Sequence, residues 1–131
     1  MNTKIIMTLS ALCLAVIGIS LTFLPEEIAD FAGLNSSKAI QLFFQLLGAL
    51  YFAFAMLNYT AKGSLIGGIY NRPIALANFT HFFMGALALN KALFSNPGLP
   101  KIFWLVAATY GIFALLFALI LFRHPLPANK V

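Results

Sequence analysis

The chain has 131 residues, of which 62% are hydrophobic and 8% charged, and its formal net charge is +5. Because an ordinary soluble domain carries about 25% charged residues, this composition excludes a soluble enzyme and a disordered tail. The basic residues are spread singly along the sequence and form no patch, so nucleic acid is not an expected partner. The sequence therefore predicts an integral membrane protein, whose first partner is the lipid bilayer.

Four long apolar runs predict an all-α fold, an integral membrane bundle of four transmembrane helices that forms a single domain over residues 1–131. In chain order, the predicted spans cover about 5–24, 39–60, 73–93 and 102–122, and a surface segment covers 25–38. A helix needs about 20 residues to cross the hydrocarbon core. Lipid offers the backbone no hydrogen-bond partners, so such long runs must be helices; barrel strands are shorter and alternate in polarity.

The first run resembles a signal peptide in its basic start at Lys4, but its apolar stretch is longer than the usual 7–15 residues of a signal core. We therefore expect a retained helix. It contains the single cysteine, Cys13, which excludes an internal disulfide and a metal cluster built on cysteines.

The surface segment 25–38 has the residues of a short helix lying on the membrane. Pro25 suits a first helical position, and Gly33 suits a helix end. Ser36 or Ser37 is then expected to cap the second span. The side chains expected to face the lipid are Ile28, Phe31 and Ala32. Further along the chain, Asn96-Pro97-Gly98 predicts a turn before the fourth span.

Basic residues between the runs predict the orientation. One side of the membrane receives Lys4, Lys62, Arg72, Arg123 and Lys130, and the other receives Lys38, Lys91 and Lys101. By the positive-inside rule, the side with more basic residues is cytoplasmic, so both termini are expected in the cytoplasm.

Small residues recur at helical spacing in the first and fourth runs, which predicts faces for close helix packing. In the first run these residues are Thr8, Ala11, Ala15, Gly18 and Thr22, and in the fourth they are Ala107, Gly111, Ala114 and Ala118. The second run has such a face in Gln41, Gln45, Gly48, Phe52 and Ala55, and the third has one in Asn78, His81, Gly85 and Ala88.

A candidate polar site within the membrane consists of His81, Asn78, Gln45, Gln41 and Tyr110. His81 falls near the middle of its span, where an ionisable group is a functional candidate. Three functional interpretations are a proton relay, a haem or metal ligand, and a hydrogen bond to a headgroup or quinone oxygen. The structural alternative is a neutral imidazole that bridges two helices, and we favour it because no second ligand or carboxylate lies nearby.

Depth along the helices suggests how these polar groups pair. Asn78 and His81 are expected to meet Tyr110 or Thr109. Gln45 lies at the depth of Ser20 and Thr22, and a hydrogen bond to one of them is expected. The alternative for the two glutamines is a polar opening toward the outside of the membrane.

No nucleophile–base pair, phosphate-binding glycine loop or metal-ligand cluster is present in the sequence. We therefore predict no enzyme activity, no catalytic residue, no cofactor and no metal site. No acidic residue lies within any predicted span, which also argues against a proton-coupled exporter that uses a buried carboxylate.

Several short motifs resemble those of the small uncharacterised bacterial four-helix membrane proteins that are grouped as domains of unknown function. The motifs are Leu24-Pro25, Ala32-Gly33-Leu34, Leu47-Gly48-Ala49 and Arg72 after a glycine-bearing loop. A remoter similarity, through Thr80-His81-Phe82, is to the four-span membrane scaffold of ergosterol biosynthesis. The first resemblance implies a location in the bacterial inner membrane, and neither supplies a catalytic residue.

Two hypotheses of function follow. The first is a non-enzymatic accessory or scaffold protein that packs against a larger membrane partner, because four spans and short loops leave no room for a soluble catalytic domain. The second is a small homodimeric transporter, channel or lipophile carrier that uses the polar residues of the bundle interior.

Overall fold

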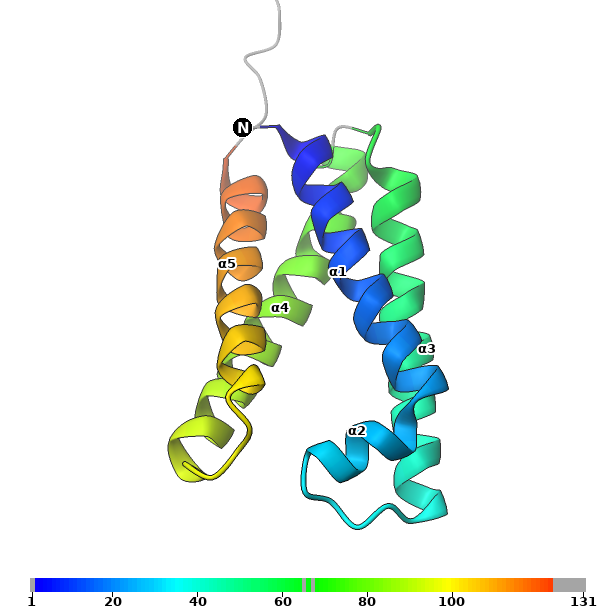
Figure 1. Cartoon of the computed structure of the whole chain (residues 1–131). Helices are drawn as coiled ribbons and strands as arrows, with labels where there is room; N and C mark the ends of the chain where they lie inside the picture. Colours follow the sequence, from blue (N-terminus) through cyan, green and yellow to red (C-terminus); the bar gives the residue numbers. More distant parts are fainter. Residues whose placement is uncertain (1, 65, 67, 124–131) are drawn as a thin grey trace, which may run out of the picture. The chain divides into compact units, whose positions relative to one another are not determined.

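A computed structural model describes residues 2–64, 66 and 68–123 of the chain (Figure 1). Within these residues every regular element is helical, and no strand is present. The elements are α1 (Thr3–Phe23), α2 (Pro25–Phe31), α3 (Lys38–Ala61), the 3-10 turn η1 (Ile69–Asn71), α4 (Arg72–Ser95) and α5 (Ile102–Phe122). The prediction of an all-α fold is confirmed, and each predicted span falls on one long helix.

Three of the helices, α1, α3 and α5, are long and apolar enough to cross a membrane. The fourth long helix, α4, has 24 residues but contains Asn78, His81 and Asn90, which lower its hydropathy. The chain therefore has the helices of a membrane protein. The described residues form two compact units, one built from residues 4–62 and the other mainly from residue 63 onward.

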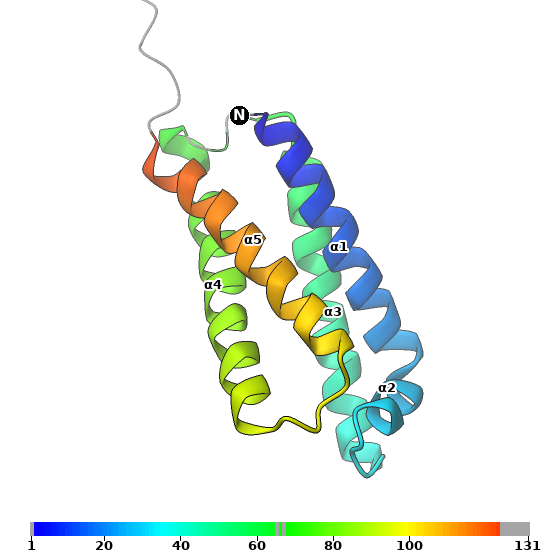
Figure 2. The ribbon, with the colours of Figure 1, turned by 60° about the vertical axis from the view of Figure 1, so that its left-hand side comes forward.

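In the first unit, α1 and α3 run side by side (Figures 1 and 2). Their backbones come into close contact at two glycines. A Cβ atom built on Gly18 would lie 2.8 Å from the carbonyl oxygen of Gly48, and one built on Gly48 would lie 2.7 Å from that of Gly18. Both distances are shorter than any ordinary carbon–oxygen contact, so the two backbones touch only because neither residue has a side chain. The small face predicted for the first span therefore packs at Gly18, as expected.

The short helix α2 forms as the sequence predicts. Pro25 occupies its first turn, and the backbone N–H of Ala32 donates to the carbonyl oxygen of Ile28 at 2.9 Å. Gly33 then adopts φ +72°, a left-handed conformation that ends a helix at little cost only for glycine. Phe31 is exposed, as expected, and Ser37 caps α3 by accepting a hydrogen bond from the backbone N–H of Ile40 at 3.3 Å.

The second unit is a hairpin of α4 and α5. The predicted turn is present, with the N–H of Leu99 donating to the carbonyl oxygen of Asn96 at 3.1 Å. Between the helices, the ring of Phe82 is fully buried and stacks on Phe113 and Phe117, with centroid distances of 4.9 Å and 5.7 Å. Aromatic side chains thus fill this core, whereas glycines bring the helices of the first unit together.

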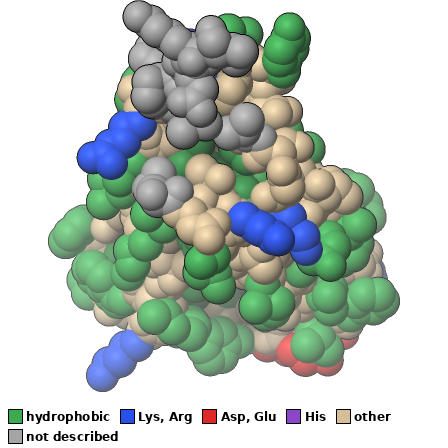
Figure 3. All heavy atoms as spheres, turned by 90° about the horizontal axis from the view of Figure 1, so that it is seen from above, with side chains coloured by type: hydrophobic (Ala, Val, Ile, Leu, Met, Phe, Trp, Pro, Cys, Tyr) green, Lys and Arg blue, Asp and Glu red, His purple; other side chains and the backbone are tan. Residues whose placement is uncertain are grey.

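The outward faces of the long helices are strongly apolar. Phe43 and Leu115 are both 69% exposed although each lies within a span. Figure 3 looks from above onto the ends of the helices and shows hydrophobic side chains there too, with a few Lys and Arg among them. The apolar sides of the helices are a different surface. Such a surface is unfavourable in water and suits contact with lipid chains.

Candidate functional site

The predicted meeting of His81 with Tyr110 occurs in the α4–α5 hairpin. The Tyr110 hydroxyl lies 3.3 Å from Nε2 of His81, and the tautomer of the imidazole decides which atom donates. Tyr110 is 2% exposed and His81 is partly buried. The pair therefore joins two helices by a polar contact inside an otherwise apolar interface.

Gly85, one turn beyond His81 on α4, provides the space for this contact. A Cβ atom built on Gly85 would collide with the ring of Tyr110, at its Cδ1 and Cε1 atoms. The ring of Phe82 also packs against Tyr110, edge to face, with a centroid distance of 5.2 Å. The tyrosine is consequently held from two sides, which fixes the direction of its hydroxyl toward His81.

Asn78 lies one turn before His81 on α4 and is fully buried. Its Nδ2 donates to the backbone carbonyl oxygen of Ile74 at 3.0 Å. The hydroxyl of Thr109, the other partner considered for this site, donates to the carbonyl oxygen of Leu105 in its own helix at 2.8 Å. Of the two partners expected for His81, the structure uses Tyr110.

The two glutamines belong to the other unit and behave differently from each other. Nε2 of Gln41 donates to Oγ of Ser36 at 2.9 Å, so this side chain closes the loop before α3. Gln45 is exposed. The hydrogen bond expected between Gln45 and Ser20 or Thr22 is not found among the described residues, since the Gln45 side chain is turned outward.

Both hydroxyls donate within their own helix. Oγ of Ser20 donates to the carbonyl oxygen of Val16, and Oγ1 of Thr22 donates to that of Gly18, each at 2.8 Å. A serine or threonine within a helix can donate in this way to the carbonyl four residues earlier, yet its oxygen can still accept a hydrogen bond. The missing contact therefore follows from Gln45 itself, because equal depth does not determine which way a side chain points around its helix, and that of Gln45 is exposed.

A second polar contact between helices was missed by the sequence analysis. Nδ2 of Asn58 donates to Oγ of Ser10 at 3.0 Å, and both residues are fully buried between α1 and α3. The hydroxyl of Ser10 in turn donates to the carbonyl oxygen of Met7 at 3.0 Å. Lys4 and Lys62 mark the same side of the membrane in the predicted topology. Ser10 is about as far along α1 from Lys4 as Asn58 is along α3 from Lys62, so the two residues lie at similar depths. A comparison of depths would therefore have found the pair.

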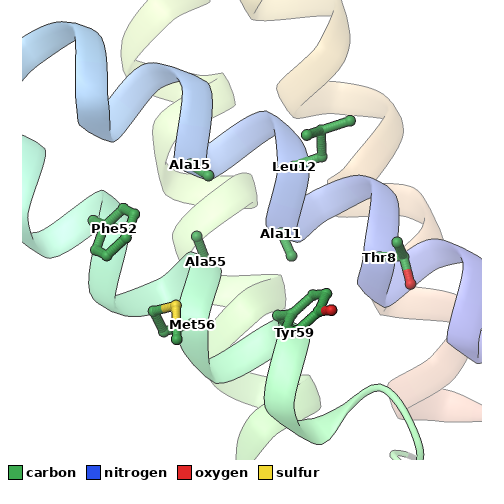
Figure 4. A pocket seen from close by; sticks show the side chains of 8 residues that line it. All are labelled: Thr8, Ala11, Leu12, Ala15, Phe52, Ala55, Met56 and Tyr59. Atoms are coloured by element: carbon green, nitrogen blue, oxygen red, sulfur yellow. The ribbon is translucent and has the colours of Figure 1, made fainter.

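Two apolar grooves lie between paired helices. One, of about 270 Å³, is formed by α1 and α3 (Figure 4). Its lining consists of Thr8, Ala11, Leu12, Ala15, Phe52, Ala55, Met56 and Tyr59. The other, of about 470 Å³, lies between α4 and α5 and includes Asn90, Gly111 and Ala118. A Cβ atom built on Gly111 would meet nothing within 4 Å, so this part of the predicted small face borders open space.

These arrangements offer hydrogen bonding and apolar contact. Across the described ranges, no three His, Cys, Asp or Glu side chains gather in a way that would hold a metal ion. His81 has the aromatic neighbours Phe82 and Tyr110, with ring centroids at 5.1 Å and 5.5 Å. Its geometry is that of a bridging imidazole within a packed interface.

No family model, curated protein or solved structure matches the chain.

Proposed function

We propose that the chain is a four-span protein of the bacterial inner membrane, with α4 as the additional span. Contacts near both ends of the hairpin support this topology: Phe79 meets Phe122 at 6.3 Å between ring centroids, and Phe94 meets Trp104 at 5.6 Å. Because α5 is long and apolar enough to cross the membrane, a helix paired with it from end to end lies at the same depth. At 1.5 Å per residue, α4 is about 36 Å long, enough for a hydrocarbon core of about 30 Å.

Both termini are proposed to be cytoplasmic, on the positive-inside rule. Single cysteines introduced at Ser64 and at Gly98 in a Cys13→Ala background test this topology. In intact cells, a membrane-impermeant maleimide is expected to label Gly98→Cys and to leave Ser64→Cys unlabelled until the membrane is opened. The reverse pattern would contradict the orientation, and equal labelling of the two in intact cells would contradict the fourth span.

Within this topology, we infer that the protein is a non-enzymatic accessory subunit that packs against a larger membrane protein. The observation that carries this inference is the groove at Gly111. At three helical glycines, atoms of the same unit occupy the space that a Cβ atom would need; these are Gly18, Gly48 and Gly85. At Gly111 that space is open. Small residues in lipid let another helix approach closely, so a groove with such a residue suits a partner helix.

The test is purification of the full chain from its own membranes in a mild detergent, followed by native mass spectrometry. A second polypeptide is expected to accompany the wild-type chain and to be lost with Gly111→Leu. Ala108→Leu is the matched control, because Ala108 is exposed on the same helix outside the groove. The inference fails when the partner is retained by Gly111→Leu or lost equally with Ala108→Leu.

The second candidate function is a homodimeric transporter, channel or lipophile carrier. The observation that favours it is the polar pair of His81 and Tyr110 within an apolar hairpin, which would suit the polar end of a bound lipophile. Native mass spectrometry would then reveal a dimer carrying a defined small molecule. Tyr110→Phe, which keeps the ring and removes the hydroxyl, is expected to lower retention of that molecule. Unchanged retention would contradict the carrier function.

A further inference from the structure

A third groove lies where α4 begins and α5 ends, and it differs from the other two because a cation lines it. Its volume is about 550 Å³, and its lining consists of Ile69, Arg72, Pro73, Leu76, Phe79, Leu121 and Phe122. All of these residues belong to the second unit. The groove combines one guanidinium with a long apolar wall.

Arg72 has no acidic residue in its own unit. The three acidic residues of the chain are Glu26, Glu27 and Asp30, and all of them belong to α2 in the other unit. Arg72 also begins α4, so it stands at the positive end of that helix dipole. An anion that approaches this end of the groove therefore meets the full charge of the guanidinium and the partial positive charge of the helix end, and the unit contains no Asp or Glu.

In the four-span topology proposed above, on which this step rests, the groove lies at a membrane–water interface. Arg72 is the first residue of α4, and Phe122 is the last residue of α5. Ile69, which lines the groove, is 89% exposed, and the adjacent Tyr70 is 96% exposed. Tyrosine is enriched at headgroup level, and an isoleucine so exposed is favourable there only when lipid covers it.

The apolar wall extends from this interface into the membrane. Leu76 and Phe79 follow Arg72 by about one and two turns of α4, and Leu121 and Phe122 face them from α5. A ligand with an anionic head at Arg72 and a flexible apolar tail would match the whole lining. Free phosphate would use only the guanidinium and would leave the wall uncovered.

We propose that this groove binds an anionic phospholipid, with its phosphate on Arg72 and one acyl chain along Leu76 and Phe79. The guanidinium presents a planar set of N–H donors that matches two phosphate oxygens. Basic pockets between transmembrane helices commonly hold anionic headgroups. This lipid site does not depend on the protein partner proposed for the groove at Gly111. The two grooves share only Phe79 among their lining residues.

The test is a titration of the full chain in detergent with dioctanoyl phosphatidylglycerol and with dioctanoyl phosphatidylcholine, read by native mass spectrometry. The anionic lipid is expected to bind about five-fold more tightly, the effect of one basic contact. Arg72→Gln is expected to abolish this preference. Lys91→Gln, an exposed basic residue of the same helix outside the groove, is expected to preserve it.

A second pair of variants tests the apolar wall. Leu76→Trp fills the groove at a position that is 51% exposed, and Met84→Trp adds the same side chain to α4 where the exposure is 58%. Weaker phosphatidylglycerol binding is expected for Leu76→Trp and unchanged binding for Met84→Trp. Because both positions are exposed, neither change is expected to prevent folding.

Several results would overturn the proposal. Equal loss of preference with Arg72→Gln and Lys91→Gln would indicate general attraction to a basic protein. If Arg72→Gln keeps the preference for the anionic lipid, the guanidinium does not bind the phosphate. Displacement of the lipid by inorganic phosphate at the same concentration, or full binding by Leu76→Trp, would indicate a site for free phosphate.

Discussion

The glycine contact between α1 and α3 makes a prediction that can be worked from distances. In Gly48→Ala, the new Cβ atom would lie 2.7 Å from the carbonyl oxygen of Gly18 and 2.8 Å from the backbone nitrogen of Thr22. It would also collide with Oγ1 of Thr22. Two of these three neighbours are backbone atoms, which cannot turn aside, so the helices must separate.

Overpacking of this kind costs about 1–3 kcal/mol. On the scale known for soluble domains of similar size, about 4 °C per kcal/mol, the expected fall in Tm is about 4–12 °C. Far-UV circular dichroism during heating in a mild detergent would measure it. Gly111→Ala is the matched control, since its Cβ would meet nothing within 4 Å. Alanine also has the higher helix propensity, so this control is expected to unfold at or slightly above the wild-type Tm.

Unfolding of Gly48→Ala at the wild-type temperature would contradict the close backbone contact. The contact is equally contradicted if Gly111→Ala loses as much stability as Gly48→Ala, because the loss would then follow from replacing any helical glycine. Gly18→Ala provides an independent check, since its Cβ would lie 2.8 Å from the carbonyl oxygen of Gly48 and 2.8 Å from the backbone nitrogen of Phe52.

Three further predictions concern other contacts. A double-mutant cycle of Ser10→Ala and Asn58→Ala, measured by unfolding in detergent, is expected to give a coupling free energy of about 0.6 kcal/mol. This is the average for hydrogen bonds between membrane helices. A coupling of zero would contradict the hydrogen bond. Phe82→Ala is expected to lower the free energy of unfolding by about 3–5 kcal/mol, because it empties a fully buried aromatic site. Phe83 is 42% exposed, so Phe83→Ala is expected to lower it by less than half as much in the same assay. Gly33→Ala is expected to cost about 1 kcal/mol, since φ +72° is unfavourable for alanine, and an unchanged Tm would argue against this helix end.

Much of the helical fold was predictable because its causes are local or compositional. The fourth predicted span, 102–122, coincides with α5, since Lys101 and Arg123 bound an uninterrupted apolar run. Pro25 and Gly33 marked the limits of α2 for equally local reasons, a fixed φ and a tolerance of positive φ.

The candidate site was predictable only where distance along the helix decided the contact. His81 and Tyr110 were expected to meet because they lie at similar depths in consecutive antiparallel spans, and they do. The same argument gave the wrong partner for Gln45, because depth says nothing about which way a side chain points around its helix. Ser10 and Asn58 were overlooked although their depths agree.

Composition by itself determined that this is a helical membrane protein, since lipid leaves a long apolar segment no other way to satisfy its backbone. The ends of the helices followed from charged and conformationally special residues nearby. Only the tertiary structure decided what each small residue does. A neighbouring helix packs directly against three of the glycines, which are Gly18, Gly48 and Gly85. Gly111 instead borders a groove. Each of the four long helices has one glycine, and each of these glycines lies on a face predicted from helical spacing. The difference between them comes from the neighbouring helix, whose rotation and crossing point are set by packing.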